Sequence, residues 1–198
     1  MSFKKIIIGL LLSMLLGSGV AVAADYDKAF KAAQSGDFKT ALAEWTPLAE
    51  QGDAKSQHNL GIMYEKGEGV PKNYKTAVKW YTLAAEQGDS NAQFNLGVMY
   101  ENGTGVPEND KTALKWFTKS ATQGQVDAQL KLGIIYQYAL GAPMDKALAY
   151  MWYNIAAYND SKQARKNKEA LAKFMKPKVL SKAQDMSNRC LESNYTDC

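Results

Sequence analysis

The sequence contains few of the side chains that build metal or nucleophilic sites. It has one histidine, His58, which excludes a multi-histidine metal site. Only two cysteines are present and they do not form a C-x-x-C motif, so dithiol redox catalysis is not expected. The motifs of a hydrolase nucleophile elbow, a phosphate-binding P-loop and an H-E-x-x-H zinc protease are also missing. We therefore expect no metal site, no cofactor and no catalytic site.

The N-terminus has the pattern of a secretory signal peptide over residues 1–24. Lys4 and Lys5 precede an apolar run at 6–16, and small residues follow at 21–24. Cleavage there predicts a periplasmic or secreted protein. The alternative is an uncleaved membrane anchor, since the segment could almost span a bilayer. We favour cleavage because the apolar core is short and is interrupted by glycine and serine.

Charge and cysteine are concentrated at the C-terminal end. Residues 161–198 carry nine basic and four acidic side chains, a net charge of +5, whereas 25–160 has a net charge of −3. A basic tail could contact anionic lipid or nucleic acid, but we favour a solvated helix face, and nucleic acid is not expected for an exported protein. Cys190 and Cys198 are eight positions apart, and we predict that they form a structural disulfide in an oxidising compartment.

A segment of the sequence recurs every 36 positions. QHNLGIMYEKGEGVP at 57–71 returns as QFNLGVMYENGTGVP at 93–107 and as QLKLGIIYQYALGAP at 129–143. A fixed period of this length is typical of arrays of stacked helix pairs. Each unit is predicted to contain a first helix, a glycine-rich turn and a second helix. The first helices are expected at 54–66, 90–102 and 126–138, and the second near 73–87, 109–123 and 145–159.

Glycine inside the first helix of each unit needs a physical reason. Gly97 lies in a helical pattern, where glycine costs roughly 0.5–1 kcal/mol relative to alanine. We interpret it as a packing glycine that lets the second helix come close. Gly103 and Gly105 are interpreted differently, as residues that end the first helix and shape the turn before Pro107.

The repeated columns resemble the Sel-one-like repeat (SLR) family, which is related to the tetratricopeptide repeat. The resemblance implies an all-α fold, an α-solenoid of about three full units. These are 53–88, 89–124 and 125–160, with an N-terminal capping helix pair at 25–52 and C-terminal capping helices at 161–198. The columns that we assign to the repeat framework are Leu60, Gly61, Tyr64, Gly69, Ala77 and Trp80, then Leu96, Gly97, Tyr100, Gly105, Ala113 and Trp116, then Leu132, Gly133, Tyr136, Ala149 and Trp152.

The resemblance implies a non-catalytic scaffold that mediates protein–protein or peptide interaction in envelope assembly or signalling. The alternative is a cell-envelope enzyme or factor acting on peptidoglycan or β-lactams, because some relatives have been linked to penicillin binding. The sole S-x-x-K motif lies at 2–5, inside the predicted signal peptide. A membrane-tethered scaffold is a third possibility. We expect a monomer with a protein or peptide partner, no nucleic acid and no stable membrane insertion after signal cleavage.

The first helices of such solenoids are expected to line the concave surface. On that face we predict partner-binding residues, namely Asn59, Asn95, Lys131, Lys55, Met63 and Met99. The asparagines could bond the backbone of an extended peptide, or could instead make structural hydrogen bonds from helix to turn. The methionines could contact a partner or fill space between repeats. His58 aligns with Phe94 and Leu130, which predicts an inter-repeat contact for it.

Overall fold

The computed structural model describes residues 24–198, so most of the predicted signal peptide lies outside the described residues. The described chain contains ten α-helices and no strand, which confirms the predicted all-α fold. The helices are α1 (Tyr26–Gln34), α2 (Phe38–Glu50), α3 (Ala54–Lys66), α4 (Tyr74–Glu86), α5 (Ser90–Asn102), α6 (Asp110–Ala121), α7 (Val126–Tyr138), α8 (Lys146–Tyr158), α9 (Lys162–Ala172) and α10 (Pro177–Glu192). Across residues 24–198, none of these helices combines the length and apolar composition needed to cross a membrane.

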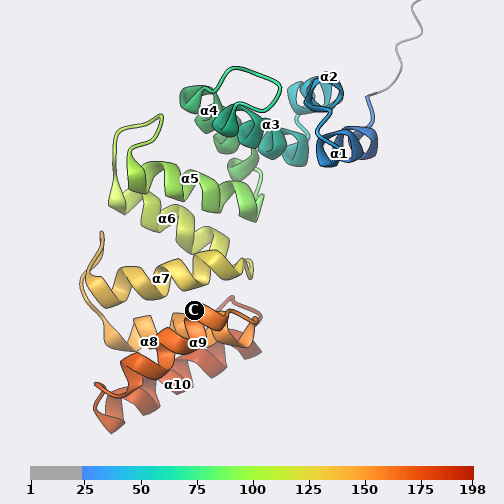
Figure 1. The fold of residues 1–198 in the computed structure, drawn as a ribbon. Helices are drawn as coiled ribbons and strands as arrows, with labels where there is room; N and C mark the ends of the chain where they lie inside the picture. Colours follow the sequence, from blue (N-terminus) through green and yellow to red (C-terminus); the bar gives the residue numbers. More distant parts are fainter. Residues whose placement is uncertain (1–23) are drawn as a thin grey trace, which may run out of the picture.

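Consecutive helix pairs stack in chain order to form a curved array, as Figure 1 shows from α1 and α2 at one end to α9 and α10 at the other. The first helices of the three repeats, α3, α5 and α7, begin and end where the sequence predicts. The second helices each begin one residue later than predicted. The reason is that Asn73, Asn109 and Asp145 lie outside the helix and accept hydrogen bonds from its first turn as N-caps.

The helix glycines lie against aromatic rings of the second helices. A Cβ atom added at Gly97 would lie 2.6 Å from the nearest ring atom of Phe117, and one at Gly61 or Gly133 would lie 2.4 Å from Tyr81 or Tyr153. All three rings are fully buried. The packing interpretation is therefore confirmed, and the group that approaches each glycine is an aromatic side chain.

The turn glycines fit one repeat onto the next. Gly105 has a φ of +75°, and a Cβ atom there would lie 2.6 Å from the carbonyl oxygen of Tyr74, the first residue of α4. Gly69 and Gly141 make the same approach to the first residues of α2 and α6. Each turn thus rests on the beginning of the preceding unit's second helix, where only glycine leaves room.

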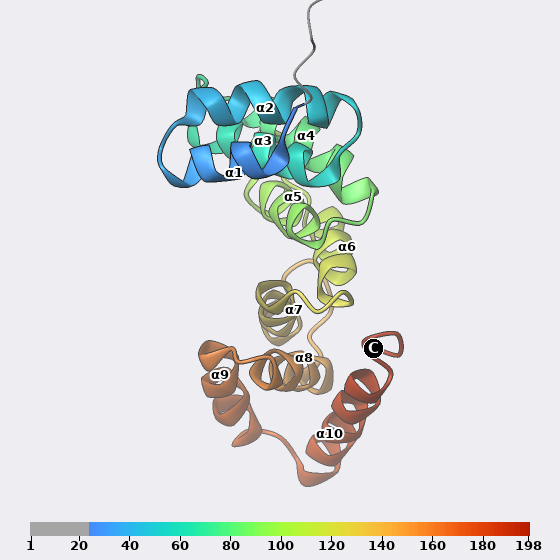
Figure 2. The same ribbon diagram turned by 90° about the vertical axis from the view of Figure 1, so that its right-hand side faces the viewer.

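The C-terminal end closes the array around α8. Figure 2 shows α9 and α10 on different sides of α8, and both helices pack against it. The helix α10 begins at Pro177, a residue suited to the first helical position because its missing N–H has no helical partner there. The predicted disulfide joins Cys190 to Cys198. Within the loop that it closes, the Tyr195 hydroxyl lies 2.9 Å from the side-chain nitrogen of Asn159 at the end of α8.

The third repeat contains an alanine where its neighbours have a turn glycine, and this position offers a stabilising substitution. Ala139 ends α7 in the left-handed region at φ 59°, ψ 38°, as Gly67 and Gly103 do for α3 and α5. Alanine in this region costs about 1 kcal/mol more than glycine, partly offset by the greater unfolded-state entropy of glycine. We expect Ala139→Gly to raise the free energy of unfolding by about 0.5 kcal/mol, measured by urea titration. The reciprocal control is Gly36→Ala, at a residue with φ +81° in open space, and it should lower the free energy of unfolding. If both variants lowered the free energy of unfolding, backbone strain at Ala139 would not be the explanation.

Candidate interaction site

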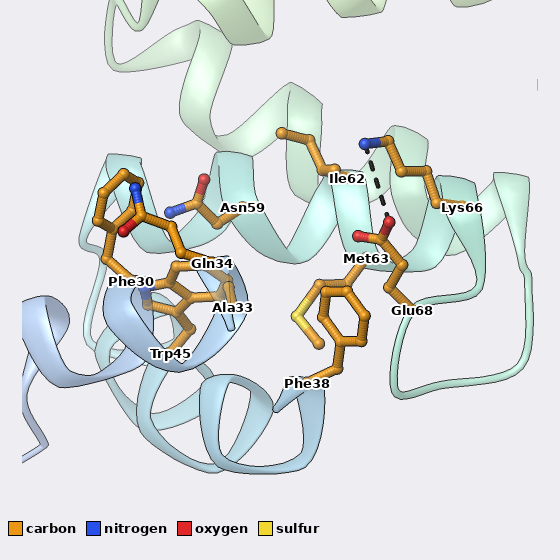
Figure 3. Close-up of a pocket in the computed structure, with 10 residues that line it drawn as sticks. All are labelled: Phe30, Ala33, Gln34, Phe38, Trp45, Asn59, Ile62, Met63, Lys66 and Glu68. Atoms are coloured by element: carbon orange, nitrogen blue, oxygen red, sulfur yellow. Dashed lines mark ion pairs between the residues drawn. The ribbon is translucent and has the colours of Figure 1, made fainter. Parts of the chain in front are cut away.

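A cavity of about 290 Å³ lies between the N-terminal helix pair and the first helix of the first repeat. Its volume is close to the lower limit for small-molecule sites, so it suits one or two side chains of a partner better than a large cofactor. Figure 3 shows the lining residues, which come from α1, α2, α3 and the turn after α3. They are Phe30, Ala33, Gln34, Phe38, Trp45, Asn59, Ile62, Met63, Lys66 and Glu68.

The lining combines apolar side chains with polar groups. Met63 lies beside the ring of Phe38, and Lys66 faces Glu68 across an ion pair of 3.9 Å (Figure 3). Phe30 is 45% exposed, so part of its ring presents apolar surface beside the cavity. An apolar group seated here would remove the exposed part of Phe30 from water, a favourable contribution to binding.

Trp45 contributes a buried donor that has no protein partner. Its indole Nε1 makes no hydrogen bond within the protein, and with only 4% of the residue exposed it has little access to water. The equivalent tyrosines of the repeats do have acceptors, because the hydroxyl of Tyr81 donates to Glu65 and that of Tyr153 donates to Gln137. Burial raises the pKa of Tyr153 to about 12, so this hydroxyl stays a donor well above neutral pH. The N-terminal pair therefore leaves one donor unsatisfied beside the cavity, at a cost of about 1–3 kcal/mol.

The predicted binding column Asn59, Asn95 and Lys131 connects neighbouring first helices to one another. The amide of Asn59 donates to the Tyr26 hydroxyl of α1 over 3.1 Å. The amide of Asn95 lies 3.1 Å from Nε2 of His58 on α3, and Lys131 lies 2.8 Å from Glu101 on α5. The alternative of a helix-to-turn hydrogen bond for the two asparagines is wrong, since both bond a first helix of the preceding unit. Partner contact by Asn59, Asn95 and Lys131 stays a prediction. The half-buried Asn59 also lines the cavity.

The prediction that Met63 and Met99 contact a partner from an open surface is wrong. Each is 2% exposed and packs within a hydrophobic cluster that joins successive units. The physical reason is that both follow the buried leucine and glycine columns on the same side of the helix, so their flexible side chains fill the space between units. Met63 is one of the residues that line the cavity. Lys55, by contrast, is exposed.

His58 is confirmed at an inter-repeat contact and does not belong to a metal cluster. Burial lowers the pKa of His58, while Asp89 and Glu65 act in the opposite direction. A neutral ring with Nε2 unprotonated can accept the hydrogen bond from Asn95. Across the described residues 24–198, no three side chains of histidine, cysteine, aspartate or glutamate gather to hold a metal ion.

A ladder of buried glutamines, which we call the glutamine ladder, was not predicted. Gln57, Gln93 and Gln129 each donate from Nε2 to an alanine carbonyl of the preceding second helix, over 3.0, 3.0 and 3.1 Å. Their Oε1 atoms accept from side chains just after the next second helix, Gln87, Gln123 and Asn159, over 2.7, 2.7 and 2.9 Å. Glutamine in the same column of all three repeats is the sequence signal that could have indicated it.

The sequence model of the Sel1 repeat family matches residues 10–37, 54–89, 90–125 and 126–161. Residues 10–23 of the first match lie outside the described part of the chain. Among solved structures, a Sel1 repeat protein of Oxalobacter formigenes is 33% identical with a TM-score of 0.70, and the match covers 73% of this chain and 59% of that protein. None of the curated proteins matches this chain.

Two further structures are similar. A protective antigen of uropathogenic Escherichia coli with an SLR fold is 29% identical with a TM-score of 0.53, and the match covers 86% of this chain and 46% of the antigen. Cysteine-rich protein B of Helicobacter pylori is 20% identical with a TM-score of 0.53, over 65% of this chain and 92% of that protein, and shows likeness of fold alone. This chain thus spans about three fifths of the Oxalobacter protein and less than half of the antigen. With the family model covering more than half of its length, the chain belongs to the Sel1 repeat family, whose repeats are generally non-catalytic scaffolds for protein–protein interaction.

Proposed function

We propose that the chain is a periplasmic or secreted scaffold without catalytic activity that binds a protein or peptide partner in envelope assembly or signalling. The cavity beside Trp45 carries this proposal, because apolar and polar side chains line it together and it is too small for most cofactors. In the proposed complex an apolar side chain of the partner enters the cavity and covers Phe30.

The polar groups around the cavity suit the backbone of that partner. Asn59 uses its amide nitrogen for Tyr26, which leaves its carbonyl oxygen as an acceptor for a backbone N–H. The exposed amide of Gln34 adds a donor and an acceptor, and Figure 3 shows it near Phe30. Amide groups of this kind recognise extended peptide without requiring a charged partner.

The proposed compartment is supported by two features of the sequence. The basic, apolar and small-residue pattern of residues 1–24 is typical of an export signal. The disulfide between Cys190 and Cys198 is of a kind that persists outside the reducing cytosol. Determining the N-terminal residue of the mature protein tests this part of the proposal, because an intact N-terminus would favour a membrane-tethered scaffold instead.

The proposed binding site predicts position-specific crosslinking in cells. A photoreactive amino acid at Gln34, on the cavity rim, should give a discrete adduct with a partner. The same residue at the exposed Lys115, on α6, should not give that adduct. Adding Phe30→Ser should reduce the Gln34 adduct by about tenfold or more, because it removes an exposed aromatic anchor from the site. Adduct yields on immunoblots provide the measurement.

A matched control separates the site from general damage to the fold. Leu83→Ser replaces an equally exposed apolar side chain, 45% exposed on α4, and should leave the Gln34 adduct unchanged. Adduct formation that is insensitive to Phe30→Ser would place the interaction elsewhere. For the enzyme alternative, turnover of nitrocefin or of peptidoglycan fragments by the purified chain would overturn the non-catalytic proposal.

A further inference from the structure

The corner between α9 and α10 combines exposed lysines with an exposed aromatic side chain. We define this basic corner by six residues, Lys173, Phe174, Lys176, Lys178, Val179 and Lys182, all of which are exposed. From residue 170 to residue 184 the sequence contains these four lysines and no acidic residue. Glu169 and Asp185 flank the segment on its two helices. The corner therefore concentrates four positive charges in a short segment, and Asp185 and Arg189 line the same surface hollow as Lys178 and Lys182.

The lysines of the basic corner are not used inside the fold. Of the ion pairs that residues 24–198 form, none involves any of the four. Phe174 is 77% exposed, more than any other large apolar side chain in the described chain. Neighbouring Met175 and Leu180 pack against the hydrophobic cluster around α8, which fixes the backbone on both sides of the corner. The corner is thus anchored by half-buried neighbours while its own side chains face solvent.

The basic corner lies at the C-terminal end of the described array. In Figures 1 and 2 the α9–α10 connection lies at the opposite end of the stack from α1 and α2. No further repeat covers it within the described chain. A flat, extended partner can reach this end without contacting the cavity at the N-terminal end.

We propose that the basic corner binds the surface of a membrane containing anionic lipid. Lysine ammonium groups near an anionic bilayer each contribute roughly 1 kcal/mol of attraction, which corresponds to about fivefold in binding. The exposed ring of Phe174 enters the interfacial region between headgroups and acyl chains, where aromatic side chains are favoured. This is peripheral attachment, and no helix inserts across the bilayer.

The composition of the corner favours lipid over nucleic acid. Four of the five basic residues at the corner and in its hollow are lysines, with Arg189 as the exception, whereas arginine is preferred where bases or phosphates are recognised by forked hydrogen bonds. Its single exposed aromatic ring is accompanied by Val179, an apolar side chain that suits a bilayer interface and offers nothing to a base. The inference is independent of the proposed partner site, because the two surfaces lie at opposite ends of the array.

Vesicle co-sedimentation of the purified chain tests the proposal. The chain should sediment with vesicles made of equal parts phosphatidylcholine and phosphatidylglycerol, and less with pure phosphatidylcholine. Replacing the four lysines by glutamine, K173Q/K176Q/K178Q/K182Q, should weaken binding by about fivefold for each lysine, several hundredfold in total. Phe174→Ser should weaken binding at every salt concentration, because its contribution is apolar and is not screened. All variants share one N-terminus, so differences between them report on the corner.

The matched control removes the same charge from elsewhere. K39Q/K75Q/K111Q/K115Q replaces four exposed lysines of α2, α4 and α6 that form no ion pair in the described chain. This variant should keep at least a tenth of the wild-type binding constant, since only long-range attraction is lost. If the two quadruple variants lost the same amount of vesicle binding, net charge alone would explain the loss and the proposal would be overturned. Failure of the wild-type chain to bind anionic vesicles would also overturn the proposal. So would binding to a DNA duplex that is tighter than binding to vesicles and is unchanged by Phe174→Ser. Circular dichroism of each variant confirms that it is folded.

Discussion

Gly105→Ala is expected to lower the free energy of unfolding by about 3–5 kcal/mol, the largest effect of any substitution considered. Two costs add at this position. Alanine at φ +75° is strained by about 1–2 kcal/mol, and its Cβ atom would lie 2.6 Å from the carbonyl oxygen of Tyr74. Because that oxygen belongs to the backbone at the start of α4, it cannot rotate away as a side chain could. The turn would have to lift from the preceding repeat.

Gly88→Ala is the matched control for Gly105. Its φ of +97° is also left-handed, but a Cβ atom there would meet no other atom within 4 Å. It should therefore show only the conformational cost, about 1–2 kcal/mol. Urea titrations followed by circular dichroism would measure both variants. Equal destabilisation would show that the contact with Tyr74 contributes nothing.

Gly97→Ala is expected to destabilise the fold by about 2–3 kcal/mol, although helix propensity predicts the opposite sign. In an isolated helix, alanine at this position would gain about 1 kcal/mol over glycine. In the array, its Cβ atom would lie 2.6–2.7 Å from two ring atoms of the fully buried Phe117. Overpacking of a rigid ring against a helix outweighs the propensity gain, because neither can move without disturbing the unit.

A double-mutant cycle tests the Gly97 explanation. Phe117→Leu removes the ring and should by itself destabilise the protein through lost apolar contact. In the Phe117→Leu background, Gly97→Ala should cost at least 1 kcal/mol less than in the wild-type background, because the space is now available. Thermal unfolding should follow the same order, with about 2–4 °C for each kcal/mol in a chain of this size. Additive effects in the cycle would exclude the ring as the cause.

The periodic part of the fold could be predicted from the sequence because its causes are local or repeated. The period placed α3, α5 and α7 correctly, since each helix begins after a capping residue and ends at a left-handed residue, which is glycine for α3 and α5 and Ala139 for α7. The role of Gly97 followed from a single contradiction between residue type and helical pattern. Helix caps and a glycine inside a helical pattern can both be recognised from a short segment of sequence.

The interaction site could not be predicted to the same degree, because it depends on which units become neighbours. The spacing of Met63 and Met99 placed them on an open face, yet both are buried in clusters that include the preceding second helix. Asn59 and Asn95 find their partners 33 and 37 positions earlier in the chain, beyond the reach of a local pattern. The cavity beside Trp45 arises where the atypical N-terminal pair meets the first repeat, and Trp45 replaces the tyrosine or phenylalanine that the repeats carry in the same column.

The glutamine ladder has a consequence for how such an array can grow. Each rung joins three successive helices through partners 8 positions before and 30 positions after the glutamine. Duplicating or deleting a whole unit of the repeat leaves every rung with an equivalent partner. An insertion of any other length that shifts one helix against the next leaves a buried amide facing the wrong groups, at about 1–3 kcal/mol for each lost partner. The array can therefore lengthen or shorten only in whole repeats. Its length can then be matched to a partner one repeat at a time while the buried hydrogen bonds stay the same.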